Sequence, residues 1–318
     1  MNKQLEKRFQ TPDGWTQDTF ENKRGRTIRY GYIFPKKAKA LVCINVGLNE
    51  FCEKYFEVIN DLLRKGYAVS IHDWMGQGMS DRYLANPHKR HIGTYQDDID
   101  DYFDLMDNHI LPRIKKQYGS NICRIMLAHS MGGHIGLHSI LRRPDIVTGA
   151  FFCAPLTRVR AMSYFPDMVS IPLLKTLGTT YHRDYVPLGD NWKPRSTHEK
   201  RALSHDPIRG NVFDVWCTDN PILKIGSPTI GWLNETELSC RNLRNADTSN
   251  IKTPMHTIFA GKDLLVNNKA SRQFFDAIES ATHETYPKAR HEIMMETDDL
   301  RDAFFKTFDT FCAQILKT

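Results

Sequence analysis

The stretch "LAHSMGGHIG", residues 127–136, places a serine between a short apolar run and a cluster of glycines. The residues "CRIMLAHS" (123–130) are apolar and few enough to form a buried strand, and Met131 and Ile135 then start the apolar spacing of a helix. The pattern therefore predicts that Ser130 lies at a sharp turn between a strand and a helix, where its hydroxyl can point at a substrate.

Small residues flank this serine at the positions where such a turn is most crowded. Ala128 and Gly132 lie two residues before and two residues after Ser130, and the turn brings them close together, so both must be small. The backbone N–H of Met131 would then face a developing oxyanion, and the start of the helix would add favourable potential. The same spacing also fits a glycine-rich helix start with a capping serine.

An aspartate and a histidine that occur later in the chain are candidates for the partners that a serine nucleophile needs. A serine hydroxyl requires a base to take its proton and an acid to orient that base. Asp263 follows the apolar run "MHTIFAG" (255–261), and His291 follows "HETYPKA" (283–289). Because parallel strands place their carboxyl ends at one edge of the sheet, we expect both side chains to lie near Ser130, in the order Ser, Asp, His.

Strand and helix patterns alternate along both ends of the chain. This alternation predicts a mostly parallel central sheet with helices on both faces. The strands are expected at 26–34, 40–47, 67–74, 123–130, 148–155, 255–261 and 283–289. The helices are expected at 55–66, at 95–118 with an interruption near Pro112, from 130 to about 143, at 269–279 and from about 299.

The alternation stops between residues 156 and 247. This section holds seven prolines and three of the five tryptophans, and it mixes basic and acidic residues. We therefore expect a one-domain core formed by 1–155 and 248–318, with 156–247 as an inserted helical cap. The run "RAMSYFPDMVSIPLLKTLG" (160–178) could line an acyl pocket or touch a membrane surface, although simple packing on the core fits each single residue as well.

Composition excludes several classes of protein. The chain has 318 residues, of which 41% are hydrophobic and 25% charged, as in globular proteins. No run of about 18 apolar residues and no secretory signal is present, so a cytoplasmic location is expected. The net charge of +6 is spread out, which argues against nucleic-acid binding and leaves contact with an anionic membrane surface open. The seven cysteines are scattered without a CxxC pair, so neither a disulfide framework nor a zinc site is indicated.

Several stretches together resemble the α/β-hydrolases of the lysophospholipase and monoglyceride lipase branch. They occur in the family's order between about residues 20 and 315: "VGLNEFCEKY" (46–55), "DWMGQGMSD" (73–81), "LAHSMGGHIG" (127–136), "SPTIGWL" (227–233), "AGKDLLVNN" (260–268) and "ARHEIMME" (289–296). The resemblance implies Ser130 as nucleophile, His291 as base and Asp263 as orienting acid. It also implies an oxyanion hole formed by the N–H groups of Met131 and Leu48.

Two positions depart from the pattern of this family. The chain has Val46 before Gly47 where the family usually has histidine, and Met75 where it usually has arginine. The first difference removes a polar group that would help to fix the oxyanion loop. It leaves the backbone donor in place, because that donor belongs to Leu48.

Other polar residues fit structural roles better than chemical ones. His134 and His138 are four residues apart on the expected helix, but no HExxH motif or third ligand accompanies them, so packed histidines are favoured over a metal site. Glu292 and Glu296 fit a solvated helix face or local support, without a catalytic role.

Asp73, Asp81 and Trp232 are expected to lie outside the catalytic site. Asp73 and Asp81 precede Ser130 and so fall outside the expected order of a triad acid. Asp263 could itself be a helix-capping or salt-bridged acid, but its order and its place after a strand favour the triad role. Trp232 is expected to be structural within the cap.

The sequence thus predicts a serine hydrolase that cleaves carboxylic esters without a cofactor or metal. The preferred substrate is a small amphipathic lipid ester, a lysophospholipid or a monoacylglycerol. A peptidase of the proline-iminopeptidase kind shares the fold and the triad, and it would need cap carboxylates that hold a substrate amine. A non-catalytic binding protein on the same fold is the remaining alternative. The oligomeric state is left open.

Overall fold

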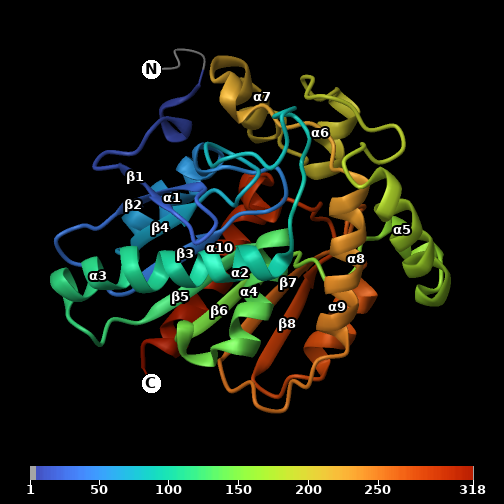
Figure 1. Ribbon diagram of the computed structural model, residues 1–318. Coiled ribbons are helices and arrows are strands. Elements are labelled where there is room, and N and C mark those ends of the chain that lie inside the picture. The colour runs from blue at the N-terminus through green and yellow to red at the C-terminus, as the bar shows by residue number, and fades with distance from the viewer. Residues whose placement is uncertain (1–4, 318) are drawn as a thin grey trace.

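The fold centres on one eight-stranded sheet, seen in a computed structural model that describes residues 5–317. The strands lie in the order β1-β2-β4-β3-β5-β6-β7-β8 (Figure 1). The pairs β1–β2 and β2–β4 are antiparallel, and every other neighbouring pair is parallel. In chain order the strands are Thr16–Glu21, Thr27–Ile33, Leu41–Asn45, Ala68–His72, Arg124–His129, Gly149–Cys153, Met255–Ala260 and Ala281–Tyr286.

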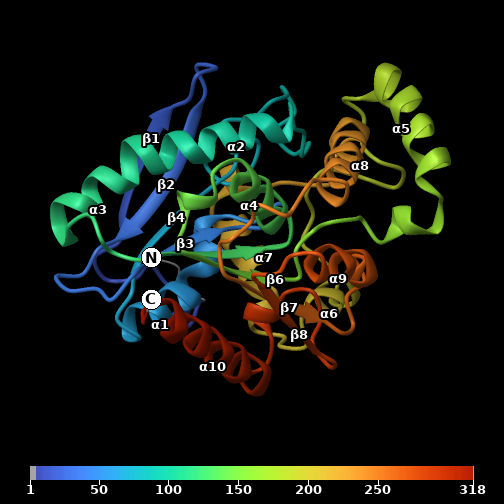
Figure 2. The same ribbon diagram turned by 90° about the horizontal axis from the view of Figure 1, so that it is seen from below.

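Helices cover both faces of this sheet (Figure 2). Phe151 of β6 packs against Phe308 of α10 with ring centroids 5.2 Å apart, whereas Phe152 packs against Phe275 of α9 at 5.6 Å. Because successive side chains of a strand point to opposite faces, α9 and α10 lie on opposite sides of the sheet. The predicted mostly parallel sheet with helices on both faces is confirmed. The helices of this part are α1 (Phe56–Arg64), α2 (Tyr95–Asp104), α3 (Leu111–Tyr118), α4 (Ser130–Arg142), α9 (Asn268–Asp276) and α10 (Asp298–Ile315).

Two elements differ from the expectation. The sequence does not predict β1, since five of its six residues are exposed and it lacks an apolar alternation. The helix expected over 95–118 is divided, because α2 continues into a π-helical stretch, Leu105–Ile110, before α3 begins. Pro112 lies in the first turn of α3, where its missing N–H removes no helical hydrogen bond.

Four helices lie in the chain between β6 and β7. They are grouped at the top and right of Figure 1: α5 (Asp167–Tyr181), α6 (Thr197–Leu203), α7 (Arg209–Asp219) and α8 (Ile230–Arg244). Helix α5 lies outermost and packs chiefly against α8. Short 3-10 turns complete the described part, at Lys7–Phe9, Cys52–Tyr55, Pro144–Ile146, Ala161–Tyr164, Pro221–Leu223 and Ile293–Met295. None of the described helices combines the length and the apolar content that crossing a membrane requires.

Candidate active site

Ser130 is the first residue of α4 and directly follows β5. Its φ of 49° lies in the left-handed region, a strained conformation that a non-glycine residue adopts where the fold imposes it. A Cβ atom on Gly132 would lie 2.2 Å from the carbonyl oxygen of Asn45, the last residue of β3. Only glycine therefore allows the start of α4 to approach the end of β3 as closely as it does.

A continuous chain of hydrogen bonds joins the three residues predicted for the triad. The His291 ring lies with Nε2 3.0 Å from Ser130 Oγ and with Nδ1 2.8 Å from Asp263 Oδ2. The other oxygen of Asp263 accepts the N–H groups of Leu265 at 2.8 Å and Val266 at 3.0 Å, which holds the carboxylate in place. Asp263 follows β7 and His291 follows β8, so both lie at the predicted edge of the sheet.

Burial and charge bias the protonation of this pair in opposite directions. Burial favours the neutral form of Asp263, but the neighbouring His291 and two backbone N–H groups outweigh it, so the pKa of Asp263 lies below its ordinary value. Burial also favours neutral His291, but the carboxylate of Asp263, with help from Glu292 and Glu50, raises the pKa of His291 above its ordinary value. An ionised acid therefore orients the imidazole and stabilises it when it takes up a proton.

The two residues predicted to supply the oxyanion donors both lie near Ser130. The N–H of Met131 belongs to the first turn of α4, where helical N–H groups have no acceptor within the helix. Leu48 lines the same cavity as Ser130. The next residue, Asn49, has a left-handed φ of 62°, which turns the loop back at this point.

Glu50 ties down the loop that carries Leu48. One oxygen of its carboxylate accepts the N–H of Gly47 at 2.5 Å and the hydroxyl of Tyr55 at 2.5 Å. Burial alone would raise the pKa of Glu50, but Lys54 and then His129 lower it to about 2, so the carboxylate is charged. The chain thus fixes its oxyanion loop although position 46 is an apolar valine.

Gln77 holds the same loop from the other side, and the sequence analysis did not identify it. Its Nε2 donates to the carbonyl oxygens of Gly47 at 2.8 Å and Glu50 at 2.7 Å, and its Oε1 accepts the N–H of Asn49 at 3.1 Å. The available signal was an amide between two glycines in "DWMGQGMSD", but the sequence does not show what that amide contacts.

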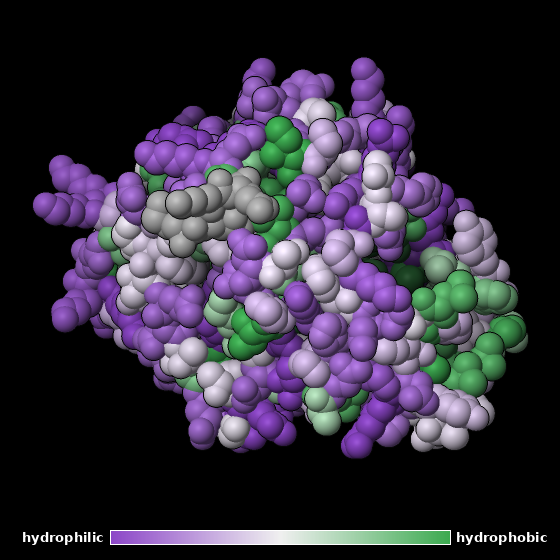
Figure 3. Space-filling view, turned by 90° about the horizontal axis from the view of Figure 1, so that it is seen from above, coloured by the Kyte–Doolittle hydropathy of each residue, from purple (hydrophilic) through white to green (hydrophobic). Residues whose placement is uncertain are grey.

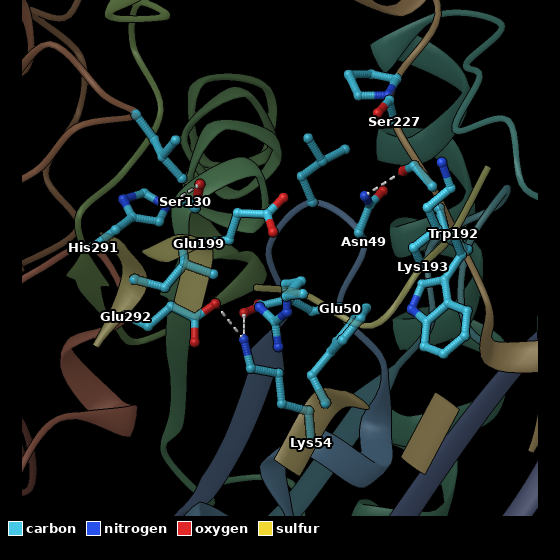
Figure 4. Close-up of a pocket in the computed structure, with 18 of the residues that line it drawn as sticks. Asn49, Glu50, Lys54, Ser130, Trp192, Lys193, Glu199, Ser227, His291 and Glu292 are labelled. Carbon is cyan, nitrogen blue, oxygen red and sulfur yellow. Dashed lines mark hydrogen bonds and ion pairs between the residues drawn. The ribbon is translucent and has the colours of Figure 1, made fainter. Parts of the chain in front are cut away.

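A buried cluster of three charges borders the nucleophile. The ammonium group of Lys54 lies 2.6 Å from a carboxylate oxygen of Glu50 and 2.6 Å from one of Glu292 (Figure 4). All three residues are buried, so the expectation of a solvated helix face is wrong for Glu292, which supports the site locally. The expectation fails because "HEIMME" forms a short 3-10 turn under the inserted helices.

Glu296 is also buried, and it links the loop of His291 to the inserted helices. Its carboxylate accepts the N–H of Arg290 at 2.7 Å, the N–H of His205 at 2.9 Å and a bond from His205 Nδ1 at 2.9 Å. Arg290 directly precedes His291, so Glu296 fixes the backbone beside the base. Its role is local support rather than exposure to solvent.

The cavity beside Ser130 has a volume of about 650 Å³. Its apolar lining includes Leu48, Leu156, Val159, Leu203, Phe213, Ile225, Trp232, Leu265 and Val266. Its polar lining includes Asn49, Glu50, Lys54, Lys193, Arg195, Glu199 and Glu292, several of which surround the opening drawn in Figure 4. Trp232, expected only to be structural, contributes to this wall. The run 160–178, expected to be a possible acyl pocket, contributes no lining residue.

The histidines of α4 have ordinary structural partners. His134 is buried, with Nδ1 3.0 Å from the carbonyl oxygen of Leu156 and Nε2 2.7 Å from Ser239 Oγ. His138 Nε2 lies 3.2 Å from the same hydroxyl. Within residues 5–317 no group of three or more His, Cys, Asp or Glu residues is arranged to hold a metal ion.

The two aspartates outside the expected order have other partners. Asp73 pairs with buried Arg29, Nε to Oδ2 2.8 Å, and accepts the N–H of Cys52 at 2.9 Å. Asp81 accepts the N–H of Thr27 at 2.9 Å. Neither contacts His291, so Asp263 is the carboxylate that the structure brings to the base.

A serine at a strand-to-helix turn, with a histidine and an aspartate after later strands of a parallel sheet, defines an α/β-hydrolase with a Ser-His-Asp triad arrangement. The chain belongs to the family described as serine aminopeptidase S33, whose model matches residues 36–298. The predicted resemblance to α/β-hydrolases is therefore confirmed.

Named relatives indicate the branch within this superfamily. The chain is 27% identical to lysophospholipase L2 of Escherichia coli K12 over 269 residues, which cover 82% of this chain and 76% of the relative. It is 25% identical to the probable lysophospholipase L2 of Haemophilus influenzae over 291 residues, covering 90% and 89%. A solved structure of a soluble variant of monoglyceride lipase from Saccharomyces cerevisiae has the same fold, with a TM-score of 0.74, 16% identity and 96% of each chain covered.

Proposed function

We propose that the protein hydrolyses carboxylic esters of single-chain lipids, lysophospholipids or monoacylglycerols, through an acyl-enzyme. One observation carries the proposal: the Asp263–His291–Ser130 chain, with contacts of 2.8 and 3.0 Å, opens onto a cavity of about 650 Å³. The names of the lysophospholipase relatives support the substrate class.

In the proposed reaction, Ser130 Oγ attacks the ester carbonyl carbon while His291 Nε2 takes the hydroxyl proton. The carbonyl oxygen becomes an oxyanion, held by the N–H groups of Leu48 and Met131. The tetrahedral intermediate collapses, and the alcohol leaves with the proton from His291. Water then attacks the acyl-enzyme in the same way, with His291 as base, and releases the carboxylic acid and the free serine.

The lining of the cavity suits a substrate with one apolar and one polar end. Leu156, Val159 and Val266 supply apolar surface for an acyl chain, and Asn49 and the charged residues of the wall supply polar partners for a head group. A single-chain lipid ester has both ends, with the ester bond between them. Segment 156–247 contributes part of this lining, so we propose that it serves as the cap.

Helix α5 and the turn before it supply a surface that suits contact with lipid. Six apolar side chains are more than half exposed there, and we call them the α5 patch: Tyr164, Phe165, Met168, Val169, Leu173 and Tyr181. Apolar side chains gather at the edge of the molecule where α5 lies (Figure 3). Contiguous exposed apolar surface of this kind favours an interaction, and a membrane surface is where the proposed substrates reside.

The class of the protein is tested by labelling with a fluorophosphonate, which reacts with activated serines. The parent protein is expected to become labelled, and a Ser130→Ala variant is not. Absence of labelling in both proteins would favour a binding protein on the same fold. Hydrolysis of a panel of lysophospholipids, monoacylglycerols and aminoacyl amides then separates an esterase from a peptidase.

The family description keeps a serine peptidase as the second candidate. Such an enzyme needs a carboxylate that holds a substrate amine. Glu50 and Glu292 both pair with Lys54, and the carboxylate of Glu199 accepts the N–H and hydroxyl of Ser196 at 2.6 Å. These contacts favour the ester reaction, and turnover of aminoacyl amides in the panel would reverse the assignment.

A further inference from the structure

Arg90 is a fully buried arginine beside the active site that no part of the proposed mechanism uses. Arg90 is 0% exposed to solvent, although it belongs to the long loop between β4 and α2. Its backbone pairs with the inserted segment, since its N–H donates to Ser227 at 3.2 Å and its carbonyl accepts the N–H of Thr229 at 2.9 Å. The side chain therefore points inward from a backbone that is fixed on both sides.

The guanidinium group contacts two side chains next to the predicted oxyanion donors. Its Nε donates to Gln77 Oε1 at 3.1 Å, and Gln77 in turn holds the loop of Leu48. Its Nη2 lies 3.7 Å from Met131 Sδ, and Met131 carries the other donor. Its Nη1 donates to the carbonyl oxygen of His91. One side chain thus touches the supports of two donors that lie in different parts of the sequence.

The charge of this group has no paired carboxylate within the described residues. The hydrogen-bond partners of the Arg90 side chain are Gln77, the carbonyl oxygen of His91 and the sulfur of Met131, none of them a carboxylate. Burial raises the pKa of nearby Asp98 to about 8, with Arg90 acting against that rise. An unpaired buried charge is costly, so its retention beside the active site calls for a reason.

The hydrogen bond from Arg90 helps to fix the orientation of the Gln77 side-chain amide. An amide side chain can turn by 180°, which exchanges its oxygen and its nitrogen. Here Oε1 accepts two N–H groups, from Asn49 and Arg90, while Nε2 donates to two carbonyl oxygens. Without Arg90 the orientation that holds the carbonyls of Gly47 and Glu50 would lose one of its four bonds.

Support of this loop by Arg90 also fits the presence of methionine at position 75. The chain has methionine where the family it resembles usually has arginine. A Cβ atom on Gly76, the next residue, would lie 2.7 Å from Nη1 of Arg90. A guanidinium group therefore does lie against this loop, supplied by a residue further along the chain.

We propose that Arg90 is a positioning residue for the reaction. Its contact with Gln77 holds the loop of Leu48, and its contact with the side chain of Met131 holds the start of α4, so that the two backbone N–H donors keep their relative positions. The inference rests on the proposed function. Oxyanion contacts act only in the transition state, so the loss of this support should lower kcat and leave KM nearly unchanged. Loss of one donor costs roughly 10²–10³ in kcat, and a misplaced donor should cost less, about 10- to 100-fold.

The test compares the purified full-length parent with three variants on a water-soluble short-chain ester. Arg90→Met removes the charge and the hydrogen bonds, and Arg90→Lys keeps the charge but cannot reach Gln77 and Met131 together. Arg82→Met is the matched control, because Arg82 lies in the same loop and bonds the carbonyl oxygens of Gly78 at 2.7 Å and Ile222 at 2.5 Å, but not Gln77. Thermal unfolding checks that each variant is folded.

The readouts are kcat, KM and the affinity of an alkyl boronic acid, whose tetrahedral adduct imitates the oxyanion. Arg90→Met is expected to lower kcat about 10- to 100-fold and to weaken boronate binding in parallel, with KM within about threefold of the parent. Arg90→Lys should fall between Arg90→Met and the parent, and it carries the test alone if Arg90→Met does not fold. Arg82→Met should keep the kcat of the parent.

Combination with Gln77→Leu tests the route of the effect. If Arg90 acts through Gln77, the double variant should lose little more kcat than the worse single variant. Additive losses of kcat in the double variant would overturn the inference. A folded Arg90→Met protein with the kcat and the boronate affinity of the parent would also overturn it. In both cases the activity of the parent would still uphold the proposed function. A parent protein without serine labelling or ester turnover would overturn both.

Discussion

The four helices between β6 and β7 form two regions that differ in how they are attached to the rest of the molecule. The anchored part, α6 and α7 (197–219), is tied to the core by buried charges. The guanidinium of Arg209 bonds both carboxylate oxygens of Glu57 in α1, at 2.8 and 2.9 Å, and Asp298 at 2.6 Å. The outer helix α5 packs chiefly against α8. It projects beyond the rest of the molecule in Figure 2.

The difference shows which of these helices can move without disturbing the site. The anchored part touches the loop that carries His291, since Glu292 N–H donates to the carbonyl of Leu203 at 2.9 Å and Ser204 Oγ donates to that of Met295 at 2.6 Å. Among the side chains that the structure describes, none from helix α5 lines the cavity. We therefore expect changes in the anchored part to alter stability and turnover, and changes in α5 to alter only the encounter with lipid.

The largest effect is expected for Arg209→Met in the anchored part. This change leaves the buried carboxylate of Glu57 without its main partner, which should lower the free energy of unfolding by about 3–5 kcal/mol. Urea unfolding followed by circular dichroism measures the difference. Lys175→Met on exposed α5 is the control and should change stability by no more than about 0.5 kcal/mol. Equal effects of the two variants would remove the distinction between the regions.

The next effect concerns the α5 patch. A triple variant, Met168→Ser, Val169→Ser and Leu173→Ser, should bind phosphatidylglycerol-containing vesicles roughly a hundredfold more weakly, at about 1 kcal/mol for each partly inserted side chain. Co-sedimentation with the vesicles measures binding. Turnover of a soluble short-chain ester should not change.

Exposed apolar residues elsewhere provide the matched control for this variant. Ile208 and Ile222 are 48% and 59% exposed and lie outside α5, so Ile208→Ser with Ile222→Ser should leave vesicle binding unchanged. If the control weakened binding as much as the triple variant, contact with lipid would not be specific to α5.

A smaller effect is expected for Glu296→Gln, where the anchored part meets the loop of His291. The amide replaces one acceptor oxygen by a donor that faces the N–H groups of Arg290 and His205. The variant should lose about 1–3 kcal/mol of stability, and kcat on the soluble ester should fall with it. Glu279→Gln is the control at an exposed carboxylate. A Glu296→Gln protein as stable as its parent would show that this contact does not anchor the helices.

The fold and the arrangement of Ser130, Asp263 and His291 could be predicted because their signals are local or ordered along the chain. Apolar runs of strand length mark the parallel strands, and Ser130, Asp263 and His291 each follow such a run. The exposed edge strand β1 lacks that signal because only one of its six residues is buried.

The supports of the site could not be predicted, because each depends on contacts between distant segments. Gln77, Arg90 and Glu296 read as polar residues in loops, and only the folded chain shows their partners. The same reason explains why Glu292 was expected to be solvated. Nothing in the sequence around Glu292 indicates that its carboxylate pairs with the ammonium group of Lys54.

The smallest expected effect tests whether the anchored side of the site also sets its electrostatics. His291 must be neutral to act as base, and its pKa is raised above the ordinary imidazole value, so kcat/KM should fall on the acid side with a midpoint above about 6.5. Glu292 is one of the carboxylates that raise it. Glu292→Gln should therefore lower the pKa of His291 and move the acid midpoint to lower pH.

The pH profile of kcat/KM on the soluble ester measures this shift. Glu199→Gln is the matched control, because Glu199 lines the same cavity but is exposed and is not among the main causes of the raised pKa of His291. The control and the α5 triple variant should keep the midpoint of the parent. A midpoint that stays fixed in Glu292→Gln, or moves to higher pH, would show that Glu292 does not stabilise the imidazolium, and the charges of Asp263 and Glu50 would then account for the raised pKa.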